Sequence, residues 1–147
     1  MKILYTASVT SVGGRNGHVQ SSDGKLNLDL AMPPEMGGKG GASNPEQLFA
    51  AGYAACFTGA MEFIARQKQI SVGEITIGAK VGIGPNDGGA GFGLAVELDV
   101  TVPALAQADA EALVKEAHQV CPYSNATRNN IDVKLTAHGG HQQAAGN

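Results

Sequence analysis

The 147-residue chain is long enough for one ordinary domain whose hydrophobic core needs no disulfide or metal support. Its formal net charge of −3 argues against a nucleic-acid-binding surface, and 43% hydrophobic against 16% charged residues excludes a disordered chain. Two cysteines are too few for a secreted disulfide scaffold, and we find neither a signal peptide nor an apolar run of membrane-spanning length. We therefore expect a cytoplasmic protein with reduced thiols that binds neither nucleic acid nor membrane.

The first half of the chain is predicted to form strands followed by a long helix. Strands are expected at 2–10 and 17–21, around a turn at Gly13-Gly14, and at 26–30, where leucines alternate with polar residues. A helix then begins at Ser43-Asn44-Pro45-Glu46 and runs to about residue 69. Two N-terminal caps fit this start: Ser43 in a capping box with Glu46, or Asn44 with Pro45 as the first helical residue.

The middle of this helix, from Leu48 to Met61, is apolar or small on almost every side. Such a helix is buried on several faces, whereas one sheet covers only one of them. A second subunit is the simplest cover for the rest. We therefore infer a homodimer.

Alternation predicts further strands at 75–83, 92–102 and 131–137, the first two joined by a glycine-rich loop at 84–91. A second helix is expected at 107–120, where Cys121-Pro122 ends it, because proline disfavours helical geometry in the residue before it. The order indicates an α+β fold in which an antiparallel sheet wraps around two main helices, in a single domain over 1–147. Residues 138–147 are expected to form a flexible tail.

No bound cofactor and no metal are predicted. The glycine run at 37–41 lacks the Lys-Ser/Thr ending and the preceding strand of a phosphate-binding loop. His118 and Cys121 have a spacing that metals use, but a closed zinc site needs four ligands and no second pair lies nearby in the sequence.

The two cysteines admit two interpretations. Free cysteine is often a buried space-filling residue, and spacing alone favours that interpretation. A reactive thiol needs an electropositive neighbour, because the thiolate is the nucleophile and apolar burial raises the thiol pKa.

Three segments carry a resemblance to a known family. Residues 44–57, NPEQLFAAGYAACF, resemble the first cysteine helix of the organic hydroperoxide resistance proteins of the OsmC-like family. Residues 120–128, VCPYSNATR, resemble their second cysteine segment and distinguish this branch from the OsmC branch. Residues 13–17, GGRNG, resemble their N-terminal arginine turn. The resemblance covers nearly the whole chain, except for the residues after Ala137.

The resemblance implies a thiol peroxidase that acts on organic hydroperoxides. Cys56 would be the peroxidatic thiol and Cys121 the resolving thiol, joined in an intramolecular disulfide. Arg15 would hold and activate the Cys56 thiolate, and Glu46 would hold Arg15. The family implies an intertwined homodimer with two sites at the interface, and dihydrolipoyl groups of a lipoylated protein as the external electron donor.

The chemistry independently favours an arginine. A guanidinium about 4 Å from a thiolate contributes roughly 4 kcal/mol at an effective dielectric constant near 20. That corresponds to about three pKa units, comparable to the increase that burial causes. Because Glu46 and Cys56 are ten residues apart, about 15 Å along a helix, Arg15 must come to the thiol from another segment or another subunit.

The substrate-binding side is expected to be apolar. Met36, Leu48 and Phe57 are candidates for an entrance that favours alkyl or fatty-acyl hydroperoxides, whereas Phe49 is equally well explained as core. Three alternatives remain open: a peroxidase of the OsmC branch, a non-catalytic dimer that binds an apolar ligand and has structural cysteines, and a redox sensor that does not turn over.

Overall fold

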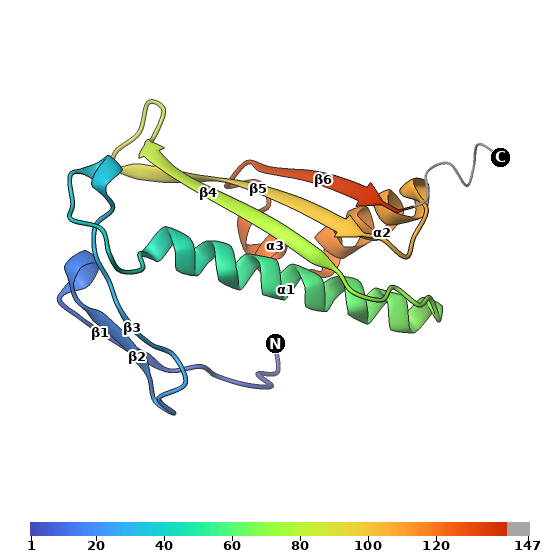
Figure 1. Cartoon of the computed structure of the whole chain (residues 1–147), viewed down its shortest axis with the longest axis horizontal. Coiled ribbons are helices and arrows are strands. Elements are labelled where there is room, and N and C mark those ends of the chain that lie inside the picture. Colours follow the sequence, from blue (N-terminus) through green and yellow to red (C-terminus); the bar gives the residue numbers. More distant parts are fainter. Residues whose placement is uncertain (141–147) are drawn as a thin grey trace. The chain divides into compact units, whose positions relative to one another are not determined.

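The computed structural model describes residues 1–140 (Figure 1). The chain divides into two compact units, Met1–Leu48 and Phe49–Asn147. The sequence predicts a single domain over the same residues.

The first unit is built on a three-stranded antiparallel sheet. Its strands are β1 (Val9–Val12), β2 (His18–Ser21) and β3 (Asn27–Asp29), paired in the order β1-β2-β3. The unit also has two 3-10 helices: η1 (Gly14–Asn16) lies between β1 and β2, and η2 (Pro34–Met36) follows β3. Residues 2–8, expected to be part of the first strand, form no strand, and the ladder begins only at Val9 opposite Ser21.

The long helix α1 (Pro45–Lys68) matches the predicted span to within one residue. Of the two predicted caps, the structure forms the second: the Asn44 side-chain oxygen accepts a hydrogen bond from the Gln47 backbone N–H at 2.8 Å. Pro45 is the first helical residue, where the missing N–H costs nothing.

By length and hydropathy alone, α1 would also qualify as a membrane-spanning helix, so the expectation that no segment reaches that length was too strict. The core helix of a globular protein passes the same test. Six α1 side chains are buried within the described residues: Tyr53, Phe57, Ala60, Met61, Ile64 and Ala65.

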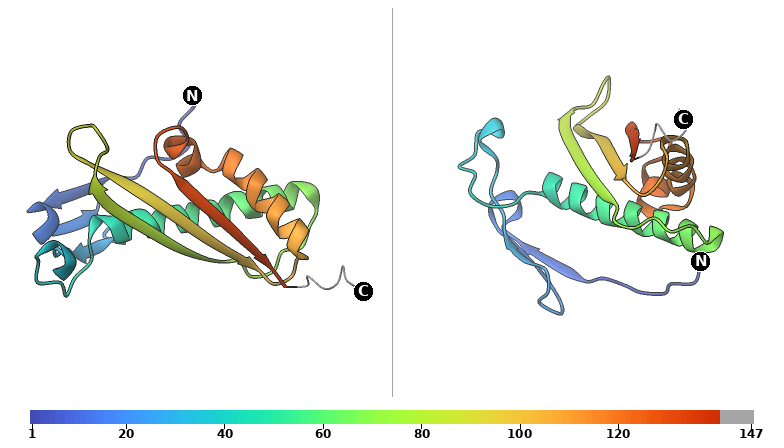
Figure 2. Two further views of the ribbon diagram at one scale, coloured as in Figure 1. Left: turned by 90° about the horizontal axis from the view of Figure 1, so that it is seen from above. Right: turned by 45° about the vertical axis from the view of Figure 1, so that its right-hand side comes forward.

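The second unit has the sheet β4 (Thr76–Pro85), β5 (Phe92–Val102) and β6 (Val133–Gly139), in that order (Figure 2). The β4–β5 hairpin is antiparallel as predicted. However, β6 runs parallel to β5, with Val96 opposite Val133 and Val102 opposite Gly139. The wholly antiparallel sheet is therefore wrong for this strand, because the intervening helices return the chain to the starting end of β5, the usual connection of parallel neighbours.

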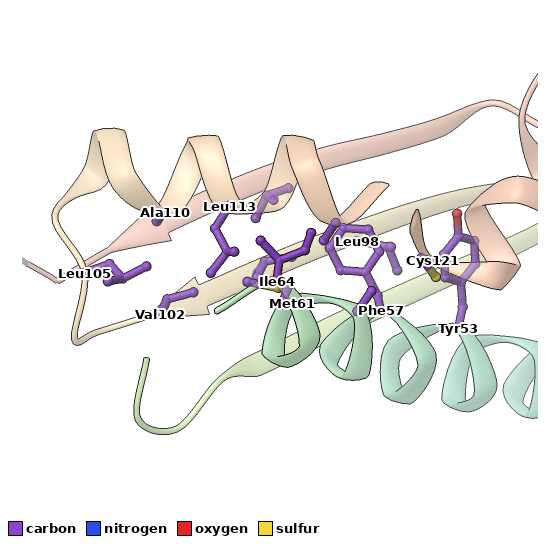
Figure 3. Close-up of a cluster of buried hydrophobic side chains, with 14 of the residues drawn as sticks. Tyr53, Phe57, Met61, Ile64, Leu98, Val102, Leu105, Ala110, Leu113 and Cys121 are labelled. Atoms are coloured by element: carbon purple, nitrogen blue, oxygen red, sulfur yellow. The ribbon is translucent and has the colours of Figure 1, made fainter. Parts of the chain in front are cut away.

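Those intervening helices are α2 (Gln107–Val120), which has the predicted bounds, and the short α3 (Pro122–Thr127). Every second residue of β5 from Val96 to Val102 is buried, and the core of the unit lies between this face and the apolar sides of α1 and α2 (Figure 3). One-sided burial with period 2 is what the alternation in the sequence predicts.

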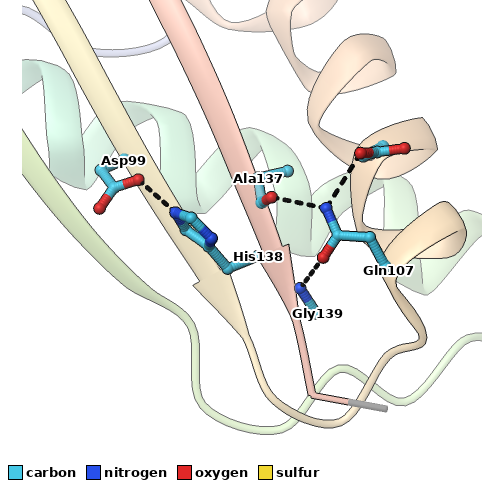
Figure 4. Close-up of polar contacts among 6 residues, drawn as sticks. Asp99, Gln107, Ala137, His138 and Gly139 are labelled. Atoms are coloured by element: carbon cyan, nitrogen blue, oxygen red, sulfur yellow. Dashed lines mark hydrogen bonds and ion pairs between the residues drawn. The ribbon is translucent and has the colours of Figure 1, made fainter. Parts of the chain in front are cut away.

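The edge strand β6 is tied to α2 by one glutamine (Figure 4). The Gln107 side-chain amide donates to the carbonyl of Ala137 at 2.8 Å, and its oxygen accepts from the Gly139 N–H at 2.7 Å. On the same strand, His138 hydrogen-bonds to Asp99 of β5. The strand therefore includes two residues that the sequence analysis assigned to the tail; residues 141–147 lie outside the described residues.

Candidate active site

The two thiols meet where α2 ends. Pro122 disfavours helical geometry at Cys121, whose backbone is extended (φ −63°, ψ 126°), so α2 stops and α3 starts afresh with proline as its first residue. This bend brings Cys121 to α1, where its thiol lies 3.5 Å, Sγ to Sγ, from Cys56. Both cysteines are free, Cys121 is fully buried and Cys56 is partly exposed. The pair therefore has one accessible sulfur and one protected sulfur.

The surroundings of Cys56 do not by themselves favour a thiolate. Burial raises the pKa of the Cys56 thiol, and its contact with Cys121 raises it further. The backbone N–H of Tyr123, at the start of α3, hydrogen-bonds to Cys56 and lowers the pKa. Because burial is the largest of these effects, activation of Cys56 needs a further positive charge.

An aromatic cluster adjoins the thiols and was not singled out from the sequence. The rings of Phe49, Tyr53 and Tyr123 pack edge-on or tilted, with centroids 5.6–6.3 Å apart. Gly52 makes room for Tyr123, since a Cβ there would lie 2.7 Å from the tyrosine hydroxyl. The signal in the sequence was the helical spacing of Phe49, Tyr53 and Cys56, which places them on one face of α1.

Arg15 and Glu46 form a separate element of the candidate site, within the first unit. Gly13 and Gly14, with φ of 84° and 62°, produce the turn that presents Arg15. Its guanidinium donates two hydrogen bonds to the carboxylate of Glu46, at 2.9 and 2.8 Å. This pairing lowers the pKa of Glu46 and raises that of Arg15, so the pair is fully ionised. Glu46 also lies in the first turn of α1, where negative charge is stabilised by the helix dipole.

The structure thus groups the four expected catalytic residues into two pairs, each complete within its own unit. Cys56 and Cys121 belong to the second unit, and Arg15 and Glu46 to the first. Contact between Arg15 and the Cys56 thiolate stays a prediction.

The expected substrate-binding residues behave differently from one another. Met36 lies in η2 with 39% of its surface exposed, and Leu48 is half-buried. Phe57 has no exposed surface and packs in the core with its ring near that of His118, so it does not line an entrance in this chain. Phe57 was a candidate because it follows Cys56 in the sequence. Adjacent residues of an α-helix point about 100° apart, so the Phe57 side chain lies in the core instead.

Within residues 1–140, no three His, Cys, Asp or Glu side chains gather closely enough to hold a metal ion. A groove of about 700 Å³ lies between α2 and β6, with Gln107, Lys115, His118 and His138 among its lining residues; neither cysteine lines it.

Comparison with known proteins gives a consistent result. The family model described as OsmC-like protein matches residues 38–136. The chain is 56% identical over 137 residues to the organic hydroperoxide resistance protein of Xanthomonas axonopodis pv. citri, covering 92% of this chain and 95% of that relative. It is 46% identical over 132 residues to organic hydroperoxide resistance protein OhrB of Bacillus subtilis, covering 90% of this chain and 96% of that one.

Solved structures agree with the fold. The crystal structure of an organic hydroperoxide resistance protein OsmC from Legionella pneumophila superposes with a TM-score of 0.89 at 52% identity, over 93% of this chain and 99% of that chain. An OsmC-like protein from Mycoplasma pneumoniae, only 16% identical, still gives a TM-score of 0.72 over 92% and 99% of the two chains. The second comparison supports the fold alone.

Proposed function

The chain belongs to the OsmC-like family, and we propose that it is a thiol peroxidase that reduces organic hydroperoxides to alcohols. The names of its relatives support a role in peroxide detoxification. The observation that carries the cysteine-based mechanism is the pair of free thiols at 3.5 Å, one accessible and one buried. We place the protein in the cytoplasm, where thiols are kept reduced.

In the first step, the Cys56 thiolate attacks the outer oxygen of the hydroperoxide ROOH. An S–O bond forms, the O–O bond breaks, and the alkoxide takes up a proton and leaves as ROH. Cys56 is oxidised to the sulfenic acid and the peroxide is reduced by two electrons. Cys56 suits this role because it is the accessible member of the pair.

In the second step, Cys121 attacks the sulfenic sulfur of Cys56. An S–S bond forms, and hydroxide leaves with the proton of the Cys121 thiol as water. The sulfurs need to approach from 3.5 Å to about 2.05 Å, the length of a disulfide bond. A resolving thiol already in contact favours disulfide formation over further oxidation of Cys56 to the irreversible sulfinic acid.

Arg15 is proposed to supply the positive charge that activates Cys56. A guanidinium remains ionised when partly buried, and its fork can bind a carboxylate and a thiolate together. Glu46 then acts as a positioning residue that holds Arg15 through two hydrogen bonds.

The electron donor is proposed to be a dihydrolipoyl group on a lipoylated protein. One of its thiolates attacks the Cys56–Cys121 disulfide and its second thiol completes the exchange, so that the donor leaves as lipoyl disulfide and both cysteines return as thiols. No cofactor would then be bound by the chain itself.

The functional unit is proposed to be a homodimer formed along α1. Ala51, Ala55, Gly59 and Phe63 recur every four residues on one side of the helix, and all are exposed within the single chain. Phe63 leaves 47% of its surface uncovered. Small residues at this spacing let a second helix approach closely, and an exposed apolar stripe of this kind is costly in water.

A charge on this stripe tests the dimer. Ala55→Arg is expected to give the mass of one chain by light scattering where the wild type gives that of two. Ala112→Arg, at an exposed alanine on α2, is the matched control and should leave the dimer intact. A wild-type protein with the mass of one chain would contradict the proposal.

Met36 and Leu48 are proposed as residues of an apolar substrate entrance. An apolar wall binds an alkyl chain and contributes little to the binding of hydrogen peroxide, so it favours organic hydroperoxides.

The test is steady-state peroxide consumption with dihydrolipoamide, comparing an alkyl hydroperoxide with hydrogen peroxide. Fast turnover that prefers the alkyl substrate and disappears in Cys56→Ser would support the proposal. Preference for hydrogen peroxide would favour a peroxidase of the OsmC branch. Oxidation of Cys56 without turnover would indicate a redox sensor, and wild-type activity no greater than that of the variant would return both cysteines to a structural role in an apolar-ligand-binding dimer.

A further inference from the structure

Four polar side chains form a chain of hydrogen bonds beside Cys121, inside an otherwise apolar core. His118 Nδ1 lies 2.8 Å from Ser124 Oγ, Ser124 Oγ lies 2.8 Å from Tyr53 Oη, and Tyr53 Oη lies 3.1 Å from Thr127 Oγ1. Thr127 Oγ1 in turn donates to the backbone carbonyl of Ser124 at 3.2 Å. Tyr53 and Ser124 have no exposed surface, and Thr127 has 2%.

Counting protons fixes the direction of these hydrogen bonds. The last acceptor is a carbonyl, so the Thr127 hydroxyl must donate to it and can only accept from Tyr53. Tyr53 then has no second proton and must accept from Ser124, and Ser124 must accept from His118. All four contacts are therefore made only when His118 carries its proton on Nδ1. Burial and the nearby Arg128 lower the pKa of His118, which agrees with a neutral ring that has this single proton.

The chain of hydrogen bonds joins the three helices α1, α2 and α3. His118 is three residues before Cys121 on α2, Ser124 is three residues after it on α3, and Tyr53 is three residues before Cys56 on α1. Figure 3 shows Tyr53 rising from α1 beside Cys121. The turn that carries Cys121 is thus anchored on both sides and fastened to the helix that carries Cys56.

Arg128 reinforces the same turn from the other end of α3. Its guanidinium donates to the backbone carbonyl of His118 and, at 2.7 Å, to the side-chain oxygen of Asn125. A free α2–α3 junction would give Cys121 many positions relative to α1, and these contacts restrict that freedom.

We propose that His118, Ser124, Tyr53 and Thr127 are positioning residues that hold the Cys121 thiol in attacking position against Cys56. For the peroxidase cycle this rests on the proposed function, because it assigns to these residues the rate of the second step, in which Cys121 displaces hydroxide from the Cys56 sulfenic acid. The positioning itself requires only the two thiols and is measurable without any peroxide.

The test uses an aromatic disulfide, Ellman's reagent, in stopped flow. Cys56 attacks the reagent in a first phase that depends on reagent concentration and releases one thiolate. Cys121 then attacks the mixed disulfide at Cys56, forms the Cys56–Cys121 disulfide and releases the second aromatic thiolate at a rate independent of reagent. The first phase reports on Cys56 alone, and the second reports on where Cys121 is held.

Ser124→Ala and Tyr53→Phe each remove two contacts of the chain. Each is expected to slow the second phase at least about tenfold and to leave the first phase within about twofold. Thr58→Ala is the matched control, because it removes a hydroxyl on the same helix that donates to the carbonyl of Ala54 at 2.9 Å, outside the hydrogen-bond chain. It should change neither phase. Tyr53→Phe keeps the ring in the core, so the test stands even where Ser124→Ala folds poorly. An unchanged second phase in a folded variant would overturn the inference.

Carbon-13 NMR of His118 gives an independent reading of the hydrogen-bond chain. The Nδ1–H tautomer is expected in the wild type and should be lost in Ser124→Ala; the Nε2–H tautomer in the wild type would contradict the assignment.

Oxidation by an alkyl hydroperoxide separates this inference from the proposed function. If the second phase slows in the variants but the hydroperoxide fails to oxidise wild-type Cys56, positioning holds and the peroxidase fails. If the hydroperoxide oxidises Cys56 but the second phase is unchanged in the variants, the peroxidase proposal holds and the positioning proposal fails. Where both hold, Ser124→Ala should form sulfenic acid at the wild-type rate and accumulate more sulfinic acid.

Discussion

Arg15 reaches both carboxylate oxygens of Glu46, a residue 31 positions further along the chain, with N–O distances of 2.9 and 2.8 Å. This two-point contact fixes the plane of the guanidinium as well as its position. The side chain of Arg15 remains 31% exposed, against 13% for Glu46, so part of the guanidinium is still available to a third partner. The pair therefore combines a fixed geometry with an accessible positive charge.

Arg15→Lys tests whether the fork matters beyond the charge. A lysine keeps one positive charge but cannot bind the carboxylate at two points and still present a donor to a thiolate. We expect the second-order rate of Cys56 oxidation by an alkyl hydroperoxide to fall about tenfold, and about a hundredfold in Arg15→Ala. Stopped-flow measurement of sulfenic acid formation checks this. Equal rates in Arg15→Lys and the wild type would mean that charge alone suffices.

The same ion pair predicts a pH dependence of stability. The pKa of Glu46 is lowered below its ordinary value of 4.5 by the hydrogen bonds from Arg15, so between the folded and unfolded values the unfolded chain binds more protons. The contribution of the pair is therefore fully present above pH 4.5 and is lost as the pH falls through the lower, folded value. Urea unfolding between pH 3 and 7 should show this loss.

Glu46→Gln is the variant for that experiment. It should lower the free energy of unfolding by about 1 kcal/mol at neutral pH, as expected for a partly exposed two-point ion pair. Its free energy of unfolding should also fall less steeply in acid than that of the wild type. Glu35→Gln, at an exposed carboxylate of the same unit, is the control and should retain the wild-type decline. Parallel curves for Glu46→Gln and the wild type would remove the pair as the cause.

Cys121→Ser should separate the two steps of the proposed cycle. Because Cys56 keeps its surroundings, we expect one equivalent of hydroperoxide to be consumed at nearly the wild-type rate, while steady-state turnover with dihydrolipoamide falls more than about tenfold. With excess hydroperoxide, mass spectrometry should find sulfinic acid at Cys56, because a second equivalent oxidises the sulfenic acid that no resolving thiol captures. The counterpart variant, Cys56→Ser, should consume no hydroperoxide. Full turnover in Cys121→Ser would exclude Cys121 as the resolving residue.

Gly52→Ala should show how closely Tyr123 approaches α1. The substitution gains about 1 kcal/mol of helix propensity, but the added Cβ would lie 2.7 Å from the Tyr123 hydroxyl and push the ring away. Loss of the aromatic contacts costs about 0.5–1.5 kcal/mol, so the net change in unfolding free energy should be close to zero.

A double-mutant cycle checks that explanation. In the background of Tyr123→Ala there is no ring to displace, so adding Gly52→Ala should stabilise the protein by about 1 kcal/mol. Urea unfolding of the four proteins gives the coupling energy between the two positions. Additive effects would mean that Tyr123 does not rest on Gly52.

Local sequence determined much of the fold. The alternation at 75–83 and 92–102 and the stop at Cys121-Pro122 are properties of a few neighbouring residues, and the observed strands and α2 follow them closely. The sequence predicts two alternative N-caps for α1, Ser43 and Asn44. Both would satisfy the same unpaired N–H groups of the first turn, so only the structure could identify Asn44 as the cap. The segments around Cys56, Cys121 and Arg15 pointed to the family before any geometry was known.

Tertiary structure decided what depends on residues far apart in the chain. Alternation in 131–137 predicts a strand but cannot say that it lies parallel to β5, because its direction is set by the path of α2 and α3. Likewise, Phe57 is assigned to the core only by the elements that cover it. The Cys56–Cys121 contact and the hydrogen-bond chain from His118 to Tyr53 join residues separated by 65 or more positions. Such contacts form only when packing between helices fixes their distances, and no local pattern encodes them.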